Sequence, residues 1–353
     1  MKGKVLVIVF LVVGASLMNA ARYDEKTKPD TQILPLEEWK RDERVDREVY
    51  KIADELEKVC IMYKDDPEAI GWSPVAEKLV YKIKGLGESA LPPILDVAKD
   101  KSRNVELRKI MMSELGFSYN PAVTEPLINF LLNKAEDESI RYNAADLLGR
   151  ILKDTTATEV LIETIEDESN PENLRIKSAS SFISIRDKRA IPHLIKIVQN
   201  ETNEDIKAMG TAALGSNAYA FKDTSITPLI IDLLRNEKNS TVKMMQIECL
   251  GCLGSLGDKR VLVPLIDLLE SRDSNFRDAI KALGNIGEPE AKEALIGLLK
   301  DKSESIRFNT TKALIKMGDK SVIPEIEKVL QTLNENHRRM IDKTLDSLKK
   351  SDK

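Results

Sequence analysis

The chain repeats one pattern of polar, apolar and basic positions eight times between residues 104 and 338. Each instance has a capping-type residue, a residue three places later that is apolar in all but the last instance, and a basic residue directly after it. The basic residues are Arg108, Arg141, Arg175, Lys207, Lys243, Arg277, Arg307 and Arg338, spaced 33, 34, 32, 36, 34, 30 and 31 positions apart. A period in this range predicts a repeat array in which each unit stacks on its neighbours.

Each unit is predicted to be a pair of antiparallel helices. The first helix opens with a proline or small residue before an apolar pair, as in Pro126-Leu127-Ile128, and proline suits the first helical turn. The second helix is expected to follow a polar N-cap. These caps would be Asn104, Asp137, Asn203, Asn239, Asp273, Ser303 and Asn334, with Pro171 at the first helical position of the third unit. Small residues on the second helices, such as Ala282 and Ala313, predict close packing between helices, and glycines near the ends of these helices predict where they stop.

The segment before the array has a different pattern, which predicts an N-terminal helical cap over residues 37–88. Apolar residues from Leu36 to Tyr63, Trp39 among them, recur as on one face of a long helix, and Val75, Leu79, Ile83 and Leu86 indicate a shorter one. A cap is expected because an array with a bare apolar end would aggregate. The repeat array is then expected to cover residues 89–350.

Residues 1–21 have the order of a secretory signal peptide. Lys2 and Lys4 precede an apolar run from Val5 to Val13, and small residues follow at Ala20 and Ala21. The run is shorter than the roughly 20 residues of a transmembrane helix, although an uncleaved anchor is the alternative. Residues 22–36 are predicted to be a flexible linker. We therefore expect a protein exported to the periplasm, cell envelope or extracellular space, with no membrane insertion beyond this segment.

The charge balance argues against nucleic acid as a partner. The chain has 54 basic and 58 acidic side chains, and removal of residues 1–21, with Lys2 and Lys4, would leave a net charge of -6. Binding to a polyanion is carried by clustered Lys and Arg, which a mildly acidic, mixed surface does not provide. We expect a monomer.

A search for catalytic chemistry returns little. His193 and His337 are the two histidines, and neither is followed by Glu, so surface or capping roles are expected for them. Cys249 and Cys252 form a CLGC motif that would suit a redox pair, but Cys249 occupies a column of small residues and is more simply buried packing, as is Cys60. The sequence thus predicts no catalytic residue, no metal site and no cofactor.

Three segments carry a resemblance to a known family: LGESALPPILDVAKD (86–100), VLVPLIDLLESRDSNFRDAIKALGNIGEPEA (261–291) and ALIGLLKDKSESIRFNTTKALIKMGDKSV (294–322). The layout of residues 74–350 resembles the HEAT repeat family, particularly the short bacterial form also found in phycobilin lyases. The resemblance implies an all-α, right-handed α-solenoid of about eight stacked antiparallel helix pairs. It also implies that a basic column holds adjacent repeats in register by bonding polar groups of the neighbouring loop. That column is Arg108, Arg141, Arg175, Lys207, Lys243, Arg277 and Arg307.

The resemblance includes two families of enzymes. The iron-dependent deoxyhypusine hydroxylases need several His-Glu pairs as metal ligands, and the sequence has none. The phycobilin lyases work in cytoplasmic light-harvesting assembly, whereas the signal at residues 1–21 indicates export. A lyase-type enzyme or enzyme accessory stays as an alternative.

The residue after each basic position is expected on the concave side of the second helix, about 200 degrees from the buried reference. This column reads Lys109, Tyr142, Ile176, Ala208, Met244, Asp278, Phe308 and Arg339, and five of the eight are apolar or aromatic. Exposed Met and aromatic side chains suit the binding of a protein segment. We therefore predict a non-enzymatic scaffold or assembly factor that binds a protein partner through Tyr142, Ile176, Met244 and Phe308. The alternatives are that curvature buries part of the column, and that the array is a purely structural spacer.

Overall fold

The computed structural model describes residues 34–153 and 155–350, and every regular element within these ranges is a helix. The prediction of an all-α stack of helix pairs is confirmed. The described residues form two compact units, 34–190 and 191–350. The predicted signal peptide at residues 1–21, and the predicted linker up to residue 33, lie outside the described residues.

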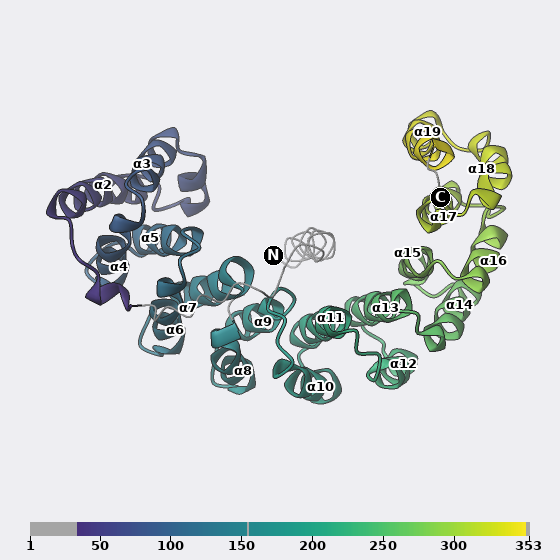
Figure 1. Ribbon diagram of the computed structural model, residues 1–353, viewed down its shortest axis with the longest axis horizontal. Coiled ribbons are helices and arrows are strands. Elements are labelled where there is room, and N and C mark those ends of the chain that lie inside the picture. The colour runs from purple at the N-terminus through teal and green to yellow at the C-terminus, as the bar shows by residue number, and fades with distance from the viewer. Residues whose placement is uncertain (1–33, 154, 351–353) are drawn as a thin grey trace. The chain divides into compact units, whose positions relative to one another are not determined.

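The first unit contains four helix pairs, each followed closely by the next (Figure 1). The pairs are α2 (Glu43–Met62) with α3 (Pro74–Gly85), α4 (Leu91–Lys99) with α5 (Val105–Phe117), α6 (Thr124–Leu132) with α7 (Glu138–Asp146), and α8 (Thr158–Glu166) with α9 (Glu172–Ser181). A π-helix, η6 (Leu147–Leu152), continues α7. Short 3₁₀ helices precede several helices: η2 (Leu36–Glu38), η3 (Pro67–Trp72), η4 (Glu88–Ala90), η5 (Pro121–Val123) and η7 (Thr155–Ala157).

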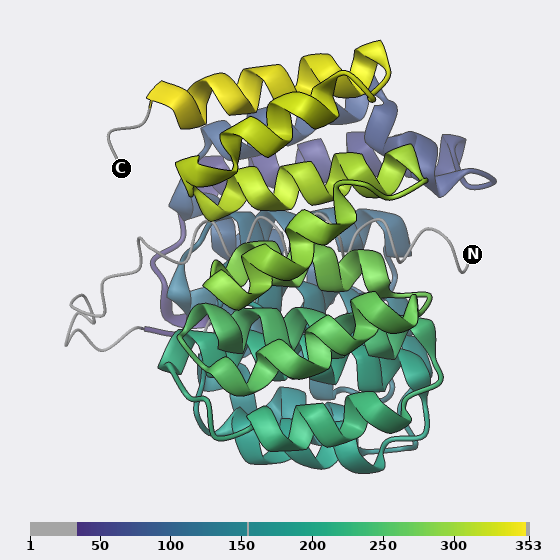
Figure 2. The same cartoon turned by 90° about the vertical axis from the view of Figure 1, so that its right-hand side faces the viewer.

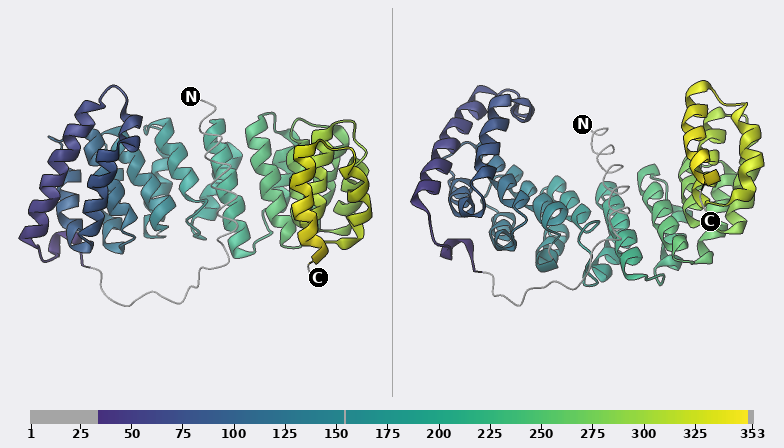
Figure 3. Two further views of the ribbon diagram at one scale, coloured as in Figure 1. Left: turned by 90° about the horizontal axis from the view of Figure 1, so that it is seen from above. Right: turned by 45° about the horizontal axis from the view of Figure 1, so that its top comes forward.

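The second unit contains five pairs, and Figures 2 and 3 show them stacked in chain order. They are α10 (Ala190–Asn200) with α11 (Glu204–Phe221), α12 (Thr227–Asn236) with α13 (Ser240–Ser255), α14 (Leu262–Ser271) with α15 (Phe276–Ile286), α16 (Pro289–Leu298) with α17 (Glu304–Met317), and α18 (Ile323–Leu330) with α19 (Glu335–Lys350). The 3₁₀ helices η8 (Lys259–Val261) and η9 (Lys320–Val322) precede α14 and α18. We call the second helix of each pair, α3 to α19 in odd numbers, a B helix.

Most of the predicted N-caps are confirmed. The side chains of Asn104 and Asp137 accept hydrogen bonds from the backbone N–H two residues later, and those of Asn203 and Asn239 accept from the N–H groups two and three residues later. Such bonds satisfy backbone donors that have no partner inside the helix. The caps therefore fix where α5, α7, α11 and α13 begin.

Two predicted helix starts are wrong. α15 begins at Phe276 with Asn275 as its N-cap, because the Asp273 side chain accepts a hydrogen bond from the Asn275 N–H instead. α9 begins at Glu172, so Pro171 is the N-cap and not the first helical residue.

The N-terminal segment differs from the prediction at both of its helices. The long helix starts at Glu43 and not at Leu36, because Asp42 caps it and leaves Trp39 outside. In α3 the buried residues are Ala76, Leu79 and Ile83, whereas Val75 is exposed. The buried stripe of α3 therefore starts one residue later than the sequence pattern indicates.

Neighbouring B helices approach closely through small residues. A Cβ added at Gly284 of α15 would lie 2.6 Å from the Cβ of Ala313 in α17, and one at Gly251 of α13 would lie 3.1 Å from the Cβ of Ala282. These distances are shorter than side chains normally allow, so glycine permits the approach. In the second unit, the B helices thus pack directly on one another.

The described residues contain no helix that is both long enough and apolar enough to cross a membrane.

Candidate functional site

In the first unit, Arg108 and Arg141 of the basic column join their helix pair to the next one. Arg108 donates from Nε to the Ala98 carbonyl at the end of α4 (2.8 Å) and forms two bonds to the Glu136 carboxylate (3.0 and 2.9 Å), which belongs to the following loop. Arg141 repeats the arrangement with the Leu131 carbonyl (2.9 Å) and Asn170 Oδ1 (2.7 Å). Arg175 donates to the Ile165 carbonyl at 2.7 Å. These contacts support a role in repeat register.

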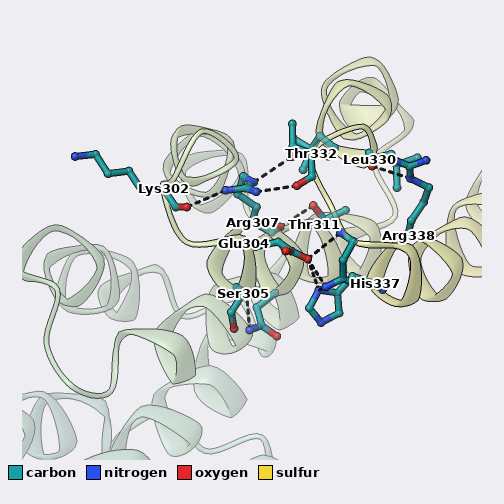
Figure 4. A network of polar contacts seen from close by, with 12 residues as sticks. Lys302, Glu304, Ser305, Arg307, Thr311, Leu330, Thr332, His337 and Arg338 are labelled. Atoms are coloured by element: carbon teal, nitrogen blue, oxygen red, sulfur yellow. Dashed lines mark hydrogen bonds and ion pairs between the residues drawn. The ribbon is translucent and has the colours of Figure 1, made fainter.

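In the second unit the same column is more varied. Lys207 and Lys243 pair with carboxylates of the next loop, Glu237 at 3.5 Å and Asp273 at 3.0 Å. Arg277 is exposed. Arg307 donates to the Asp301 carbonyl (2.8 Å) and the Thr332 carbonyl (2.8 Å), and so links α17 to the loop after α18 (Figure 4).

The four residues predicted to bind a partner do not share one environment. Tyr142 is 39% exposed and Ile176 is half-buried, whereas Met244 is 8% and Phe308 9% exposed. Met244 lies in α13, which packs against both α11 and α15. Met244 and Phe308 are therefore buried by packing, as the alternative interpretation of the predicted concave column expects.

Phe308 is covered by a histidine of the last helix. The His337 ring stacks on the Phe308 ring with centroids 4.1 Å apart. His337 Nδ1 lies 2.7 Å from Glu304 Oε1 (Figure 4). Asn334 accepts a hydrogen bond from the His337 backbone N–H at 3.0 Å. His337 thus attaches α19 to α17.

The cysteines of the CLGC motif lie on α13, where Cys249 is buried and Cys252 is half-buried. The Sγ of Cys249 lies 3.1 Å from where a Cβ of Gly215 would stand. Burial raises the pKa of the Cys249 thiol well above its usual value, and burial, followed by Glu248, raises the pKa of Cys252 to about 11. Burial therefore disfavours the thiolate, which is the reactive species, at both cysteines.

A different set of side chains stands out on the B helices of the first unit. Tyr81 of α3 is 66% exposed and Tyr119, just after α5, is 65% exposed; Phe117 and Tyr142 are also exposed. Cations lie between these rings. We call Tyr81, Lys84, Phe117, Tyr119, Tyr142, Arg150 and Lys177 the aromatic–cationic row.

Contacts connect the row in two stretches. Lys84 Nζ lies 5.9 Å from the Tyr81 ring centroid and 5.6 Å from the Phe117 ring centroid. Lys177 Nζ lies 5.0 Å from the Tyr142 ring centroid. These are cation–π distances.

The second stretch is organised around one carboxylate. Asp146 accepts hydrogen bonds from Arg150 (2.7 Å) and Lys177 (3.0 Å). The hydrogen bond from Arg150 to Asp146 is the main cause that raises the pKa of the Arg150 guanidinium. Burial raises the pKa of Asp146, but Arg150 and Lys177 lower it by more, and the carboxylate stays ionised.

Glu114 lies beneath the first stretch. It is 8% exposed, and its carboxylate is 3.8 Å from Lys84 Nζ. Burial raises the pKa of Glu114, which Lys84 only partly offsets. The row therefore combines exposed rings with cations, and the buried Glu114 lies beside it.

The second unit presents a different surface. Among its described residues, the large apolar side chains that are well exposed are Val263 and Met340. On its B helices Lys281 pairs with Glu248 at 2.7 Å, and Lys312 and Lys316 are exposed. An aromatic surface of the kind seen in the first unit is thus confined, among these residues, to 34–190.

Sequence reasoning found Tyr142 but missed the rest of the row. Tyr81 lies in the segment predicted as an N-terminal cap. Phe117 and Tyr119 lie at the end of a B helix, outside the column of residues that directly follow the basic positions. The sequence does carry a signal for these residues: aromatic rings occur near the C-terminal ends of two successive B helices, at Tyr81 in α3 and Phe117 in α5. Within the described residues, no group of three or more His, Cys, Asp and Glu is placed to hold a metal ion.

The HEAT repeats model matches residues 124–215, 191–279 and 276–345, which together span more than half of the chain. The chain belongs to the HEAT repeat family. A comparison of this HEAT-repeat chain with curated proteins finds no match.

Solved structures of three natural proteins have similar stacks of helices. The complex of CpcE and CpcF of phycocyanin lyase from Nostoc sp. is 22% identical, with 73% of this chain and 94% of that chain covered and a TM-score of 0.43. Human deoxyhypusine hydroxylase is 13% identical, with 78% and 98% covered and a TM-score of 0.35. YibA of Escherichia coli is 17% identical, with 78% and 97% covered and a TM-score of 0.47. At these values, the likenesses carry no argument about the activity of this HEAT-repeat protein.

Proposed function

We propose that this protein is an exported, non-enzymatic scaffold that holds a protein partner on the aromatic–cationic row of its first unit. The observation that carries the proposal is the exposure of Tyr81, Phe117, Tyr119 and Tyr142 along successive B helices. Tyr and Arg are enriched where protein surfaces bind tightly, because they combine a large apolar area with polar groups. A stacked array supplies the rigid support that such a surface needs.

Export rests on the sequence of residues 1–21, which has the charged, apolar and small-residue order of a signal peptide. In that setting the partner would be an envelope or extracellular protein. We assign no catalytic role to the row; the ionised acid beside it, Asp146, is held by hydrogen bonds from Arg150 and Lys177. A lyase-type accessory and a plain spacer are outcomes of the following test.

The test is capture of envelope proteins by residues 22–353. The row variant carries Tyr81→Ser, Tyr119→Asn and Tyr142→Ser, which are exposed positions whose replacement should leave the fold intact. The matched control carries Val263→Ser and Met340→Ser, the exposed apolar positions of the second unit. Circular dichroism verifies that all three proteins are helical.

We expect a partner that binds the parent and the control and is lost by the row variant. Equal capture by all three proteins would place binding elsewhere, and no capture by any of them would favour a spacer. A pigment or small molecule that co-purifies with the parent would favour a lyase-type accessory.

A further inference from the structure

One part of the aromatic–cationic row has the composition of a receptor for a cation. Tyr81 from α3 and Phe117 at the end of α5 place two rings within 5.9 and 5.6 Å of one ammonium group, that of Lys84. The Glu114 carboxylate lies 3.8 Å from the same nitrogen. Two π faces and one carboxylate around a single point form an environment that is strongly attractive to positive charge.

Glu114 has an unusual environment for a structural acid. It is more than nine-tenths buried, and the influences on the pKa of its carboxyl are burial, which raises it, and the charge of Lys84, which lowers it, with no hydrogen bond among them. Its contact with Lys84 exceeds hydrogen-bond distance. By contrast, the buried Glu136 accepts two bonds from Arg108. A buried carboxylate normally requires such donors, because burial without them costs free energy.

Lys84 is poorly suited to be the final partner of this acid. Half of its side chain is exposed, and it belongs to the last turn of α3. A lysine has a flexible stem and one compact charge, so a longer or better-aligned cation can displace it without disturbing the helix. An arginine would offer several N–H donors to Glu114 and a flat face to the rings.

We propose that Tyr81, Phe117 and Glu114 form a subsite for a basic side chain of the partner, with arginine as the preferred residue, and that Lys84 occupies this subsite when no partner is bound. The inference rests on the proposed function, since it names the chemistry that the row recognises. A partner segment would insert its guanidinium between the rings and donate to Glu114, while Lys84 turns to solvent.

The subsite can be tested without the partner. The probes are two capped tripeptides, acetyl-Gly-Arg-Gly-amide and the same peptide with citrulline, which keeps the shape of arginine but is uncharged. Their affinities are measured by NMR titration of residues 22–353 and of Lys84→Met. We expect the arginine probe to bind Lys84→Met about tenfold more tightly than the parent, because the competing cation is gone, and to bind at least about tenfold more tightly than the citrulline probe.

Two further variants keep the test decisive. Lys84→Met combined with Glu114→Gln should lose the preference for arginine over citrulline, because the carboxylate is replaced by a neutral amide of the same shape. Lys84→Met combined with Tyr81→Leu should weaken arginine binding several-fold and leave the fold unchanged, because Tyr81 is exposed.

Equal affinity for both probes, or an unchanged preference after Glu114→Gln, would overturn the proposal, as would no binding by Lys84→Met. These results are independent of envelope capture. A chain that captures a partner but shows no arginine preference refutes the subsite alone, whereas an arginine preference without capture refutes the scaffold proposal alone.

Discussion

At the scale of single residues, stability depends on where charged groups are buried. Arg108 and Glu136 are nearly inaccessible and satisfy each other with two hydrogen bonds, while Arg108 also binds the Ala98 carbonyl. A bidentate pair of this kind fixes both distance and orientation. It therefore helps to hold the α4–α5 pair against the loop that leads to α7.

Arg108→Ala is expected to lower the free energy of unfolding by about 3–5 kcal/mol, because it leaves the Glu136 carboxylate buried without its partner. Urea denaturation followed by circular dichroism measures the change. Arg235→Ala is the control, since Arg235 and Asp232 form an exposed pair worth at most about 1 kcal/mol. Similar losses for both variants would refute this role of Arg108.

Two buried carboxyls should respond to pH with opposite signs. Burial raises the pKa of Glu136, but hydrogen bonds from Arg108 lower it by more, so its net pKa lies below the ordinary 4.5; its stabilisation exists above that value and is lost as pH falls through the folded pKa. The pKa of Glu114 is raised by burial, so stability is lost as pH rises through its folded pKa. At pH 7 Glu136→Gln should therefore destabilise and Glu114→Gln should stabilise.

Thermal unfolding of both variants at pH 7 and near pH 4 provides the measurement. The two differences from the parent should have opposite signs at pH 7 and both should shrink toward pH 4. Differences of the same sign would contradict the assigned pKa directions.

Replacement of Tyr119 by glycine should raise the stability of the fold and weaken partner binding. Its φ of 55° is unfavourable for a residue with a Cβ, and Tyr119→Gly is expected to raise the free energy of unfolding by up to about 1 kcal/mol. The same change removes a ring of the row and should weaken partner capture. Lys222→Gly relieves a comparable backbone strain in the second unit and should leave capture unchanged.

At the scale of helices, small residues set the distance between neighbouring B helices. Gly284 lies against Ala313, and Gly251 against Ala282, with no space for another methyl group. The sequence predicts the N-caps and these small columns because both depend on local bonding and on a residue's own size. It does not predict that Met244 and Phe308 are buried, because this depends on neighbouring helices and on His337 from 29 residues along the chain.

Gly284→Ala is expected to destabilise the second unit by about 1–3 kcal/mol, because the added methyl group would collide with Ala313. Gly297→Ala is the matched control: it lies in α16 with nothing within 4 Å of the new Cβ. That change should stabilise by up to about 1 kcal/mol through helix propensity. Thermal denaturation of both variants measures these changes. An unchanged stability of Gly284→Ala would contradict the close approach of α15 and α17.

At the scale of the whole molecule, the two units share one architecture and differ in their surfaces. The repeat period alone predicts the helix pairs, since each pair satisfies the same local packing problem. The row could not be predicted in this way, because Tyr81, Phe117 and Tyr119 occupy positions that do not recur in every unit. The proposed function rests on these positions that break the repeat, whereas the fold rests on the positions that keep it.

The most direct test of this account is site-specific crosslinking of the protein in an envelope extract, where the proposed function expects its partner. A photoreactive phenylalanine analogue replaces Tyr81 or Tyr142 in the first unit, or Val263 in the second, all of which are exposed. The account predicts one common adduct from the two positions of the row and none from Val263. Adducts from Val263 alone, or no adduct from the row, would contradict the claim that the first unit holds the partner.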